Sequence, residues 1–167
     1  MQINRYKQKN KLSCGPVVLK MTLSYCSKSV SERDIINGVG GLKKFGVRTV
    51  KLAEFARKLG FKVAYYSFNR QLADNRAVIK KPSIKDVKKF LKRKIPVILS
   101  VNSRILYNNL KQKITGHFIV ITKYKNGIFW YNDPKDGRRH SIKEDDLIFA
   151  WHNNILDSSG YLLIIEK

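Results

Sequence analysis

Apolar positions in the first part of the chain recur with the spacing of a helix. In the segment that follows Pro16, they fall on one face of a 3.6-residue period. Proline suits the first turn of a helix, because the N–H that it lacks would have no partner there. The pattern therefore predicts a helix from about Gly15 to Ser27, with Cys14 at its N-terminus.

Four further segments have apolar spacing or end signals that are typical of helices. Ser31, Thr49 and Ser83 precede three of them and are predicted as N-caps, because their short polar side chains accept hydrogen bonds from the first free N–H groups. Gly60 is the expected stop of the second. The predicted helices after the first span residues 31–38, 49–59, 83–94 and 143–151.

From Pro96 onward the pattern changes to short runs rich in β-forming residues. Asn126-Gly127 and Asp136-Gly137 lie between such runs and predict antiparallel hairpins. Residues 69–81 are expected to form a connection, and residues 102–116 a long loop of the kind that is often functional. The predicted strands are 62–68, 97–101, 118–124, 128–131, 138–142 and 161–166.

This order of elements predicts an α+β fold in which N-terminal helices pack on a C-terminal antiparallel sheet. The chain of 167 residues is 43% hydrophobic, which suits one domain with a substantial core. We expect a single domain over residues 1–167, with a helical half over about 1–95 and a sheet half over about 96–167. Neither a membrane-spanning segment nor an apolar signal core is apparent, so a cytoplasmic location is the simpler expectation.

The charge balance is strongly positive, with 34 Lys and Arg against 12 Asp and Glu and a formal net charge of +22. The densest basic segment is Lys80–Lys94, whose apolar residues are spaced three and four apart, as in an amphipathic helix. Two readings remain open. The lysines form a solvated surface, or they bind an anionic partner such as nucleic acid, an anionic membrane surface or an acidic substrate.

Both cysteines, Cys14 and Cys26, fall on the first predicted helix, where twelve residues of rise separate them by about 18 Å. A disulfide needs Cα atoms within about 7 Å, so we expect two free thiols. The chain has no Cys-x-x-Cys pair and its three histidines lack ligand spacing, so neither a metal nor a cofactor is expected. A packing role is the expectation for Cys26.

Cys14 is a candidate nucleophile, because free N–H groups and the dipole at a helix N-terminus favour the thiolate. Gln8 lies six positions earlier, where a short loop can return its amide to the sulfur. That amide and the Cys14 backbone N–H would be two donors for an oxyanion. The alternative is a buried structural cysteine beside a surface glutamine.

A second group of candidates lies in the predicted sheet. His117 opens an apolar strand, and Asp133 lies at the end of the next strand, across the Asn126-Gly127 turn. The hairpin would bring the two side chains together, so that Asp133 orients the imidazole and the other ring nitrogen takes the Cys14 proton. Separately, these residues also suit a structural histidine and a turn residue before proline.

Taken in order, these motifs resemble the papain-like cysteine peptidases, and most closely the branch that processes double-glycine leader peptides of bacteriocins. The resemblance extends over nearly the whole chain and includes Gln-x5-Cys-Gly-Pro, Leu-x-x-Phe-Ala-x-x-Leu-Gly-Phe, Pro-Val-Ile, Gly-His-Phe-x-Val, Asp-Pro and Phe-x-Trp. It implies that Cys14 is the nucleophile and His117 the general base and then acid. Asp133 would orient His117, and Gln8 would complete the oxyanion hole.

The predicted function is that of a cysteine endopeptidase acting on a peptide or protein, with a Gly-Gly leader site as the specific expectation. The best-known members are fused to transporters, but no Gly-x-x-x-x-Gly-Lys-Ser/Thr motif is present here, so no ATPase activity is expected. Two alternatives stay open. The scaffold is a basic binding module that uses Lys80–Lys94, or the same triad catalyses another acyl transfer, such as amide exchange or isopeptide cleavage.

Overall fold

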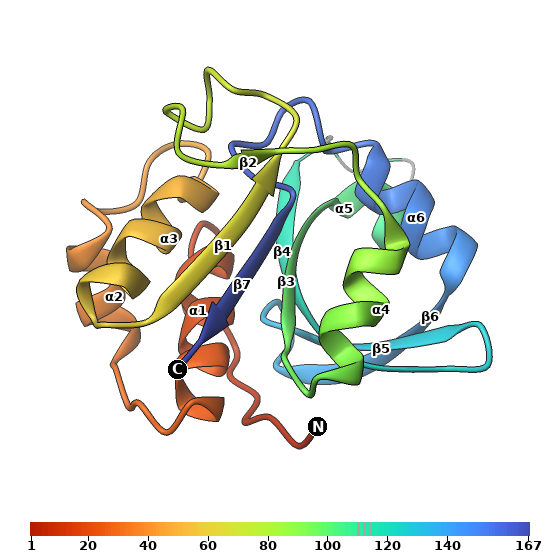
Figure 1. The fold of residues 1–167 in the computed structure, drawn as a ribbon, viewed down its shortest axis with the longest axis horizontal. Helices are drawn as coiled ribbons and strands as arrows, with labels where there is room; N and C mark the ends of the chain where they lie inside the picture. The colour runs from red at the N-terminus through yellow and green to blue at the C-terminus, as the bar shows by residue number, and fades with distance from the viewer. Residues whose placement is uncertain (110, 112, 114) are drawn as a thin grey trace.

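A seven-stranded sheet forms the middle layer of the protein, with helices on both faces (Figure 1). The computed structural model describes residues 1–109, 111, 113 and 115–167. The helices are α1 (Cys14–Tyr25), α2 (Glu32–Gly38), α3 (Thr49–Lys58), α4 (Ile84–Lys92), α5 (Ser103–Leu106) and α6 (Glu144–His152). The strands are β1 (Lys62–Ser67), β2 (Val78–Ile79), β3 (Val97–Asn102), β4 (Gly116–Lys125), β5 (Ile128–Asp133), β6 (Arg138–Lys143) and β7 (Leu162–Glu166).

The strands follow the order β2-β1-β7-β3-β4-β5-β6, and every pair except β1–β2 is antiparallel. β4 and β5 are joined by the two-residue turn Asn126-Gly127, in which both residues have positive φ, at 50° and 76°. This is the turn whose twist matches that of paired strands. The antiparallel hairpin and the α+β class are thus as the sequence predicts.

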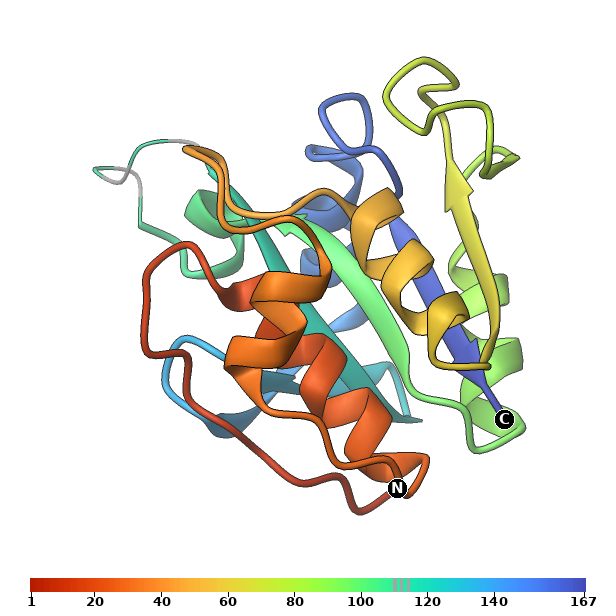
Figure 2. The ribbon, with the colours of Figure 1, turned by 90° about the vertical axis from the view of Figure 1, so that its left-hand side faces the viewer.

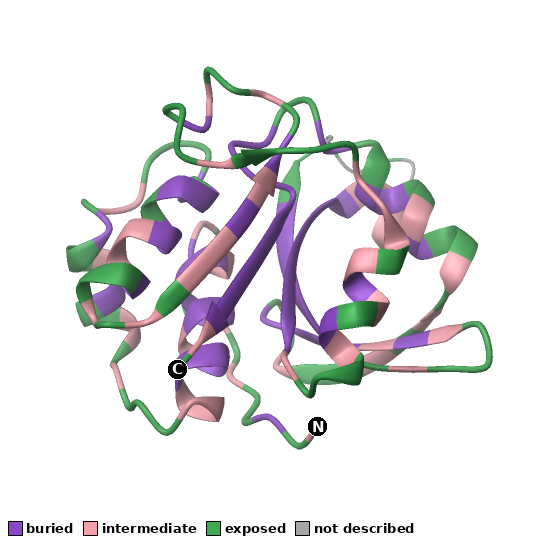
Figure 3. Ribbon diagram, in the orientation of Figure 1, coloured by how far each residue is buried: buried purple, intermediate pink, exposed green. Residues whose placement is uncertain are grey.

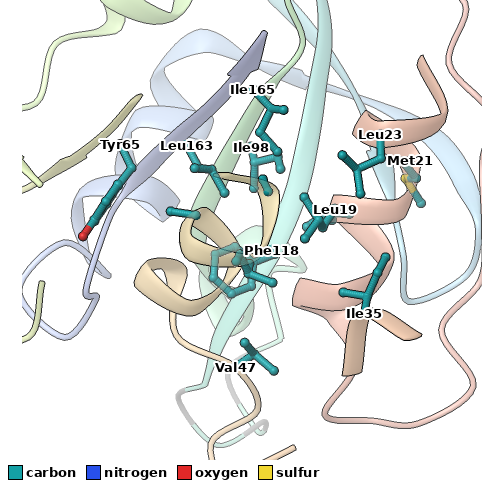
Figure 4. Packing of buried hydrophobic residues seen from close by; sticks show 14 of the residues in the cluster. Leu19, Met21, Leu23, Ile35, Val47, Tyr65, Ile98, Phe118, Leu163 and Ile165 are labelled. Atoms are coloured by element: carbon teal, nitrogen blue, oxygen red, sulfur yellow. The ribbon is translucent and has the colours of Figure 1, made fainter. Parts of the chain in front are cut away.

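Each face of the sheet has its own hydrophobic core. One cluster packs α1, α2 and α3 against side chains such as Ile98 and Leu163, as Figure 4 shows, and in Figure 2 these helices lie in front of the sheet. The other cluster packs α4 and α6 against the opposite face. The central strands β3, β4 and β7 are buried on both faces, which explains why they are nearly continuous apolar runs (Figure 3).

The division into a helical half before about residue 96 and a sheet half after it needs correction. β1 pairs with β7 and β2 pairs with β1, so two strands of the sheet come from the first 95 residues. Residues 69–81 were expected to be only a connection, but they include β2, which returns in parallel to β1. Likewise α4, from the first half, packs on the face of the sheet opposite α1.

The predicted N-caps differ in outcome. Ser31 accepts a hydrogen bond from the Asp34 N–H at 3.0 Å, and Ser83 caps α4 in the same way. Thr49 instead is the first residue of α3, and its hydroxyl donates to the Gly160 carbonyl at 2.7 Å. Thr49 therefore ties α3 to the segment before β7, a contact between distant parts of the chain that local sequence does not reveal.

Candidate active site

Cys14 is the first residue of α1, at one end of the sheet. Leu12 N–H donates to the Asn10 side chain at 2.8 Å, and the Ser13 hydroxyl donates to the Asn10 carbonyl at 2.9 Å. These bonds form a tight turn immediately before the helix, which holds the Cys14 backbone in place. The thiol is half-buried and faces the neighbouring strand β4.

Cys14 and His117 line the same hollow, and their side chains lie close enough for each to shift the pKa of the other. Burial is the largest single effect and raises the pKa of the thiol, but the interactions with His117 and with the Phe118 and Gly15 N–H groups together outweigh it, so the net pKa lies below its ordinary value. Burial alone would lower the pKa of His117, whereas its bonds to Asp133 and Cys14 raise it to about 9. These opposite shifts, a lowered thiol pKa and a raised imidazole pKa, favour the thiolate–imidazolium form of the pair over the neutral form, and the thiolate is the reactive form of such a thiol.

The structure also brings His117 and Asp133 together. The Nε2 atom of His117 lies 2.8 Å from Asp133 Oδ1. Both residues are buried, with 8% of His117 and 1% of Asp133 exposed. Since Nε2 contacts the carboxylate, Nδ1 is the ring nitrogen left for the thiol. The desolvated carboxylate would by burial alone have a raised pKa, but its bonds to His117, Tyr107 and the Lys135 N–H lower that pKa below the usual value.

Tyr107 is a member of this cluster that sequence reasoning missed. Its hydroxyl donates to Asp133 Oδ2 at 2.7 Å, and its ring centroid lies 5.9 Å from that of His117. Lys135 covers the other side, with its backbone N–H donating to Asp133 Oδ1 at 2.8 Å and its Nζ 3.7 Å from the Tyr107 ring centroid. The carboxylate thus has three donors, one from each neighbouring segment.

Tyr107 belongs to the long loop that was expected to be functional. The loop begins with α5, whose N-cap Asn102 accepts hydrogen bonds from the Arg104 and Ile105 N–H groups. Residues 110, 112 and 114 of the loop lie outside the described residues. The only signal for Tyr107 is a single aromatic residue in a polar loop before the histidine strand.

Gln8 lines the same hollow as Cys14, but its side-chain amide is held by Asn10. Its side-chain amide N–H donates to the Asn10 carbonyl at 2.8 Å, which leaves the second N–H of the amide available. Its Oε1 atom is buried and has no hydrogen-bond partner among the described residues. The Gln8 backbone N–H donates to the Pro134 carbonyl at 2.7 Å, so the N-terminal segment is tied to the turn that follows Asp133.

Gly15 has a packing role at the start of α1. A Cβ atom at this position would lie 3.3 Å from Leu52 Cδ1 and 3.4 Å from the Phe118 ring. The absence of a side chain therefore lets α1 approach both α3 and β4 closely. This close approach places the start of α1 next to His117.

A cleft passes over Cys14 and has two hollows that share Cys14, Phe45 and Gly116. The hollow on the His117 side, which we call the histidine side, also contains Gln8 and has a volume of about 650 Å³. The other hollow is lined by Asn154 and Ser158; we call it the asparagine side, and its volume is about 380 Å³. A chain laid along the cleft would pass directly over the sulfur.

The pKa of the Cys26 thiol is shifted in the opposite direction from that of Cys14. Both thiols are free, but burial raises the pKa of Cys26, an effect that the charge of Lys167 only partly offsets.

Within the described part of the chain, no group of three or more His, Cys, Asp or Glu side chains is placed to hold a metal ion, and no helix is long and apolar enough to cross a membrane.

The basic segment Lys80–Lys94 is partly neutralised. Lys80 pairs with Asp86 at 2.7 Å, Lys88 with Glu144 at 2.7 Å, and Arg93 with Glu166 at 2.7 Å. The remaining lysines of α4 line a hollow of about 570 Å³ together with Lys123 and Tyr124, away from Cys14.

Comparison with known proteins identifies the family of this chain. The model of the Peptidase_C39-like family matches residues 1–154. The chain belongs to this family. It is therefore a cysteine peptidase, a hydrolase with the papain-like fold that the sequence motifs predict. A search of curated proteins finds no match.

Solved structures of other peptidases share the fold of this C39-like peptidase. A proposed C39-like peptidase from Bacillus anthracis is 15% identical with a TM-score of 0.71, covering 100% of this chain and 98% of its own. A double-glycine motif protease from an AMS/PCAT transporter, in complex with its leader peptide, is 21% identical with a TM-score of 0.63, covering 98% and 91%. The peptidase domain of Streptococcus ComA, a bifunctional ABC transporter of a quorum-sensing pathway, is 18% identical with a TM-score of 0.61, covering 99% and 98%.

Proposed function

We propose that this C39-like peptidase cleaves peptide bonds through an acyl-enzyme on Cys14, with His117 as acid and base and Asp133 as the residue that orients it. The observation that carries the proposal is the continuous chain of contacts from the Cys14 thiol through His117 to the buried Asp133 carboxylate. A structural cysteine would need neither a lowered pKa nor a paired imidazolium.

In the first half of the reaction, the Cys14 thiolate attacks the carbonyl carbon of the scissile bond and forms a C–S bond. The negative charge moves to the carbonyl oxygen, where the Cys14 backbone N–H and the free amide N–H of Gln8 are the proposed donors. As the C–N bond breaks, His117 gives its Nδ1 proton to the leaving amine. The products of this half are a thioester and a free amine.

In the second half, a water molecule gives a proton to the now neutral His117 and its oxygen attacks the thioester carbon. The C–S bond breaks, a carboxylic acid leaves, and Cys14 and His117 return to the thiolate–imidazolium state. If an amine takes the place of this water, the same steps give amide exchange. Mass spectrometry of the N-terminal product separates hydrolysis, which leaves a free carboxylate, from transfer to an added amine.

For the substrate, we propose a leader peptide cut after Gly-Gly. The asparagine side of the cleft supports this, because it is the smaller of the two hollows beside Cys14 and is lined in part by the apolar side chains of Val47, Leu72 and Phe118. Such a site suits small residues next to the sulfur and apolar side chains farther upstream. The double-glycine protease in complex with its leader peptide shares the fold. We further propose that residues 1–167 act as one peptidase domain, because both cores share the strands β3, β4 and β7.

The first test is alkylation by iodoacetamide at Cys14 and Cys26 across pH, read separately by peptide mass spectrometry. Cys14 should react at pH values well below those at which Cys26 reacts, and His117→Ala should abolish this difference, since it removes the cation that stabilises the thiolate. Equal pH profiles for the two thiols in the wild type would show that Cys14 is not activated.

Turnover of a quenched Gly-Gly peptide then tests the roles. Cys14→Ala and His117→Ala should lower kcat by about 10⁴-fold or more, and Asp133→Ala by less, because the orienting member of such a triad is usually the least costly to remove. Cys26→Ala is the matched control and should retain wild-type turnover. Full turnover by Cys14→Ala would mean that another group is the nucleophile.

We propose as a second candidate function the binding of a polyanion such as nucleic acid at the hollow beside α4. The favouring observation is that Lys85, Lys89 and Lys92 line this hollow without an ion pair among the described residues. Anisotropy of a labelled single-stranded oligonucleotide should show binding that weakens steeply with salt and that is lost on changing these three lysines to Glu. Salt-independent binding, or none at low salt, would remove this candidate.

A further inference from the structure

Charge is distributed unevenly along the cleft. Lys11, Lys44 and Lys135 line the histidine side, and no Asp or Glu among the described residues lines it with them. On the asparagine side, Arg48 is balanced by Asp157. The electrostatic potential that acts on a bound chain is therefore more positive on the histidine side than on the asparagine side.

The three lysines are free to bind a ligand. All three are exposed, and no ion pair joins any of them to an acidic group in the described part of the chain. Lys135 lies over the Tyr107 ring, which holds its cation at the wall of the hollow and leaves its charge uncompensated. The neighbouring carboxylate of Asp136 lies 2.9 Å from His140 Nε2.

The chemistry of the proposed mechanism sets the direction of the substrate. His117 must reach the leaving amine to protonate it, so the segment that follows the scissile bond lies on the side of Cys14 where His117 lines the cleft. That side is the one with the three lysines. The segment before the scissile bond then lies on the asparagine side, where His117 is not among the lining residues.

We infer that this peptidase selects substrates with acidic side chains in the positions directly after the scissile bond, through Lys11, Lys44 and Lys135. The inference rests on the proposed function, because it uses the direction in which that reaction runs. The acidic residues leave with the amine product. Specificity after the cleavage site would thus add to the selection of residues before it.

The expected size of the preference follows from the exposure of the lysines. An exposed ion pair changes an equilibrium by about twofold to fivefold at moderate ionic strength. Two or three such pairs should therefore favour an acidic over a neutral peptide by about tenfold in kcat/KM. Added salt should reduce this ratio, since charges on a surface are screened within about 10 Å at 0.1 M salt.

The test uses a library of quenched peptides that share one sequence before the cleavage site and carry Asp, Ala or Lys in the next three positions. We expect the order Asp, Ala, Lys in kcat/KM for the wild type, and the reverse order for the variant K11E/K44E/K135E. The control variant K28E/K58E/K125E has the same net charge, but its changes lie at the far ends of α1, α3 and β4 or just beyond them, and it should keep the wild-type order. The inference is overturned if peptides are cleaved and the wild type shows no acidic preference, or if the two variants behave alike.

A measurement that needs no turnover separates this inference from the proposed function. Iodoacetate and iodoacetamide both alkylate a thiolate, but only iodoacetate carries a negative charge. The rate of alkylation of Cys14 by iodoacetate, divided by the rate with iodoacetamide, should fall by about fivefold or more in K11E/K44E/K135E. The same ratio should remain near the wild-type value in the control variant. An unchanged ratio overturns the inference, whereas failure to cleave any peptide, with the ratio shifted as expected, overturns only the proposed function.

Discussion

Removal of the Tyr107 hydroxyl tests how the Asp133 carboxylate is kept charged inside the protein. The hydroxyl donates at 2.7 Å to Oδ2 of a side chain in a residue that is 1% exposed, so Tyr107→Phe leaves that oxygen without this donor and without ready access to solvent. A hydrogen bond to a charged group contributes about 1.5–3 kcal/mol. We expect the free energy of unfolding to fall by about this amount at pH 7.

The sign of the pH dependence follows from the lowered pKa of Asp133. A carboxyl group whose pKa is lower in the folded state contributes stability above its unfolded pKa, and this stability is lost as pH falls through the folded pKa. Tyr107→Phe raises the folded pKa and removes part of this contribution. The stability difference between the wild type and the variant should therefore be largest at pH 7 and shrink as the pH falls through the folded pKa of Asp133, which lies below the usual carboxyl value.

Urea unfolding followed by tryptophan fluorescence at pH 7 and at a series of successively lower pH values measures both effects. Tyr25→Phe is the matched control, because its hydroxyl donates at 2.9 Å to the uncharged and exposed Lys94 carbonyl. That control should lose about 1 kcal/mol or less, with little dependence on pH. The reasoning is refuted if Tyr107→Phe costs no more than Tyr25→Phe at pH 7, or if its cost does not decrease as the pH is lowered through the series.

Two further predictions concern the pH profile and the start of α1. The kcat/KM profile should be bell-shaped with a falling limb near pH 9 from His117, and Asp133→Asn should move that limb to lower pH because it removes the negative charge that helps to raise the His117 pKa; a limb that stays in place would contradict this assignment. Gly15→Ala should lower stability by about 1–3 kcal/mol, since the new Cβ would lie 3.3 Å from Leu52 Cδ1. Gly15→Ala combined with Leu52→Ala should lose less than the sum of the two single changes, and strict additivity in urea unfolding would contradict the packing role.

The features that the sequence predicted well are those encoded by nearby residues. The α1 spacing, the Ser31 and Ser83 caps and the Asn126-Gly127 turn depend on a few consecutive positions, and the structure has all of them. The turn fixes the pairing of β4 with β5, and this pairing is what brings His117 to Asp133. One local signal thus placed two residues of the candidate site.

The features that the sequence did not reveal depend on contacts between distant segments. Thr49 has the ordinary signature of an N-cap, yet its hydroxyl bonds to Gly160. The Tyr107 bond to Asp133 crosses from a loop without periodic pattern to the end of β5. The assignment of α4 to the face opposite α1 is also hidden, because an amphipathic helix shows which of its own faces is buried and not which layer it joins.

The position of β7 between β1 and β3 has a consequence for biosynthesis. Lys62 of β1 pairs with Glu166 of β7, about 100 positions later, and β7 also pairs with β3. During translation, the edge of β1 and the edge of β3 that pair with β7 therefore lack their partner strand until residue 166 has left the ribosome. The asparagine side of the cleft includes Asn154, Ser158 and Ser159 from the segment that leads into β7. A nascent chain that has already made Cys14 and His117 thus has no complete cleft until β7 takes its place in the sheet.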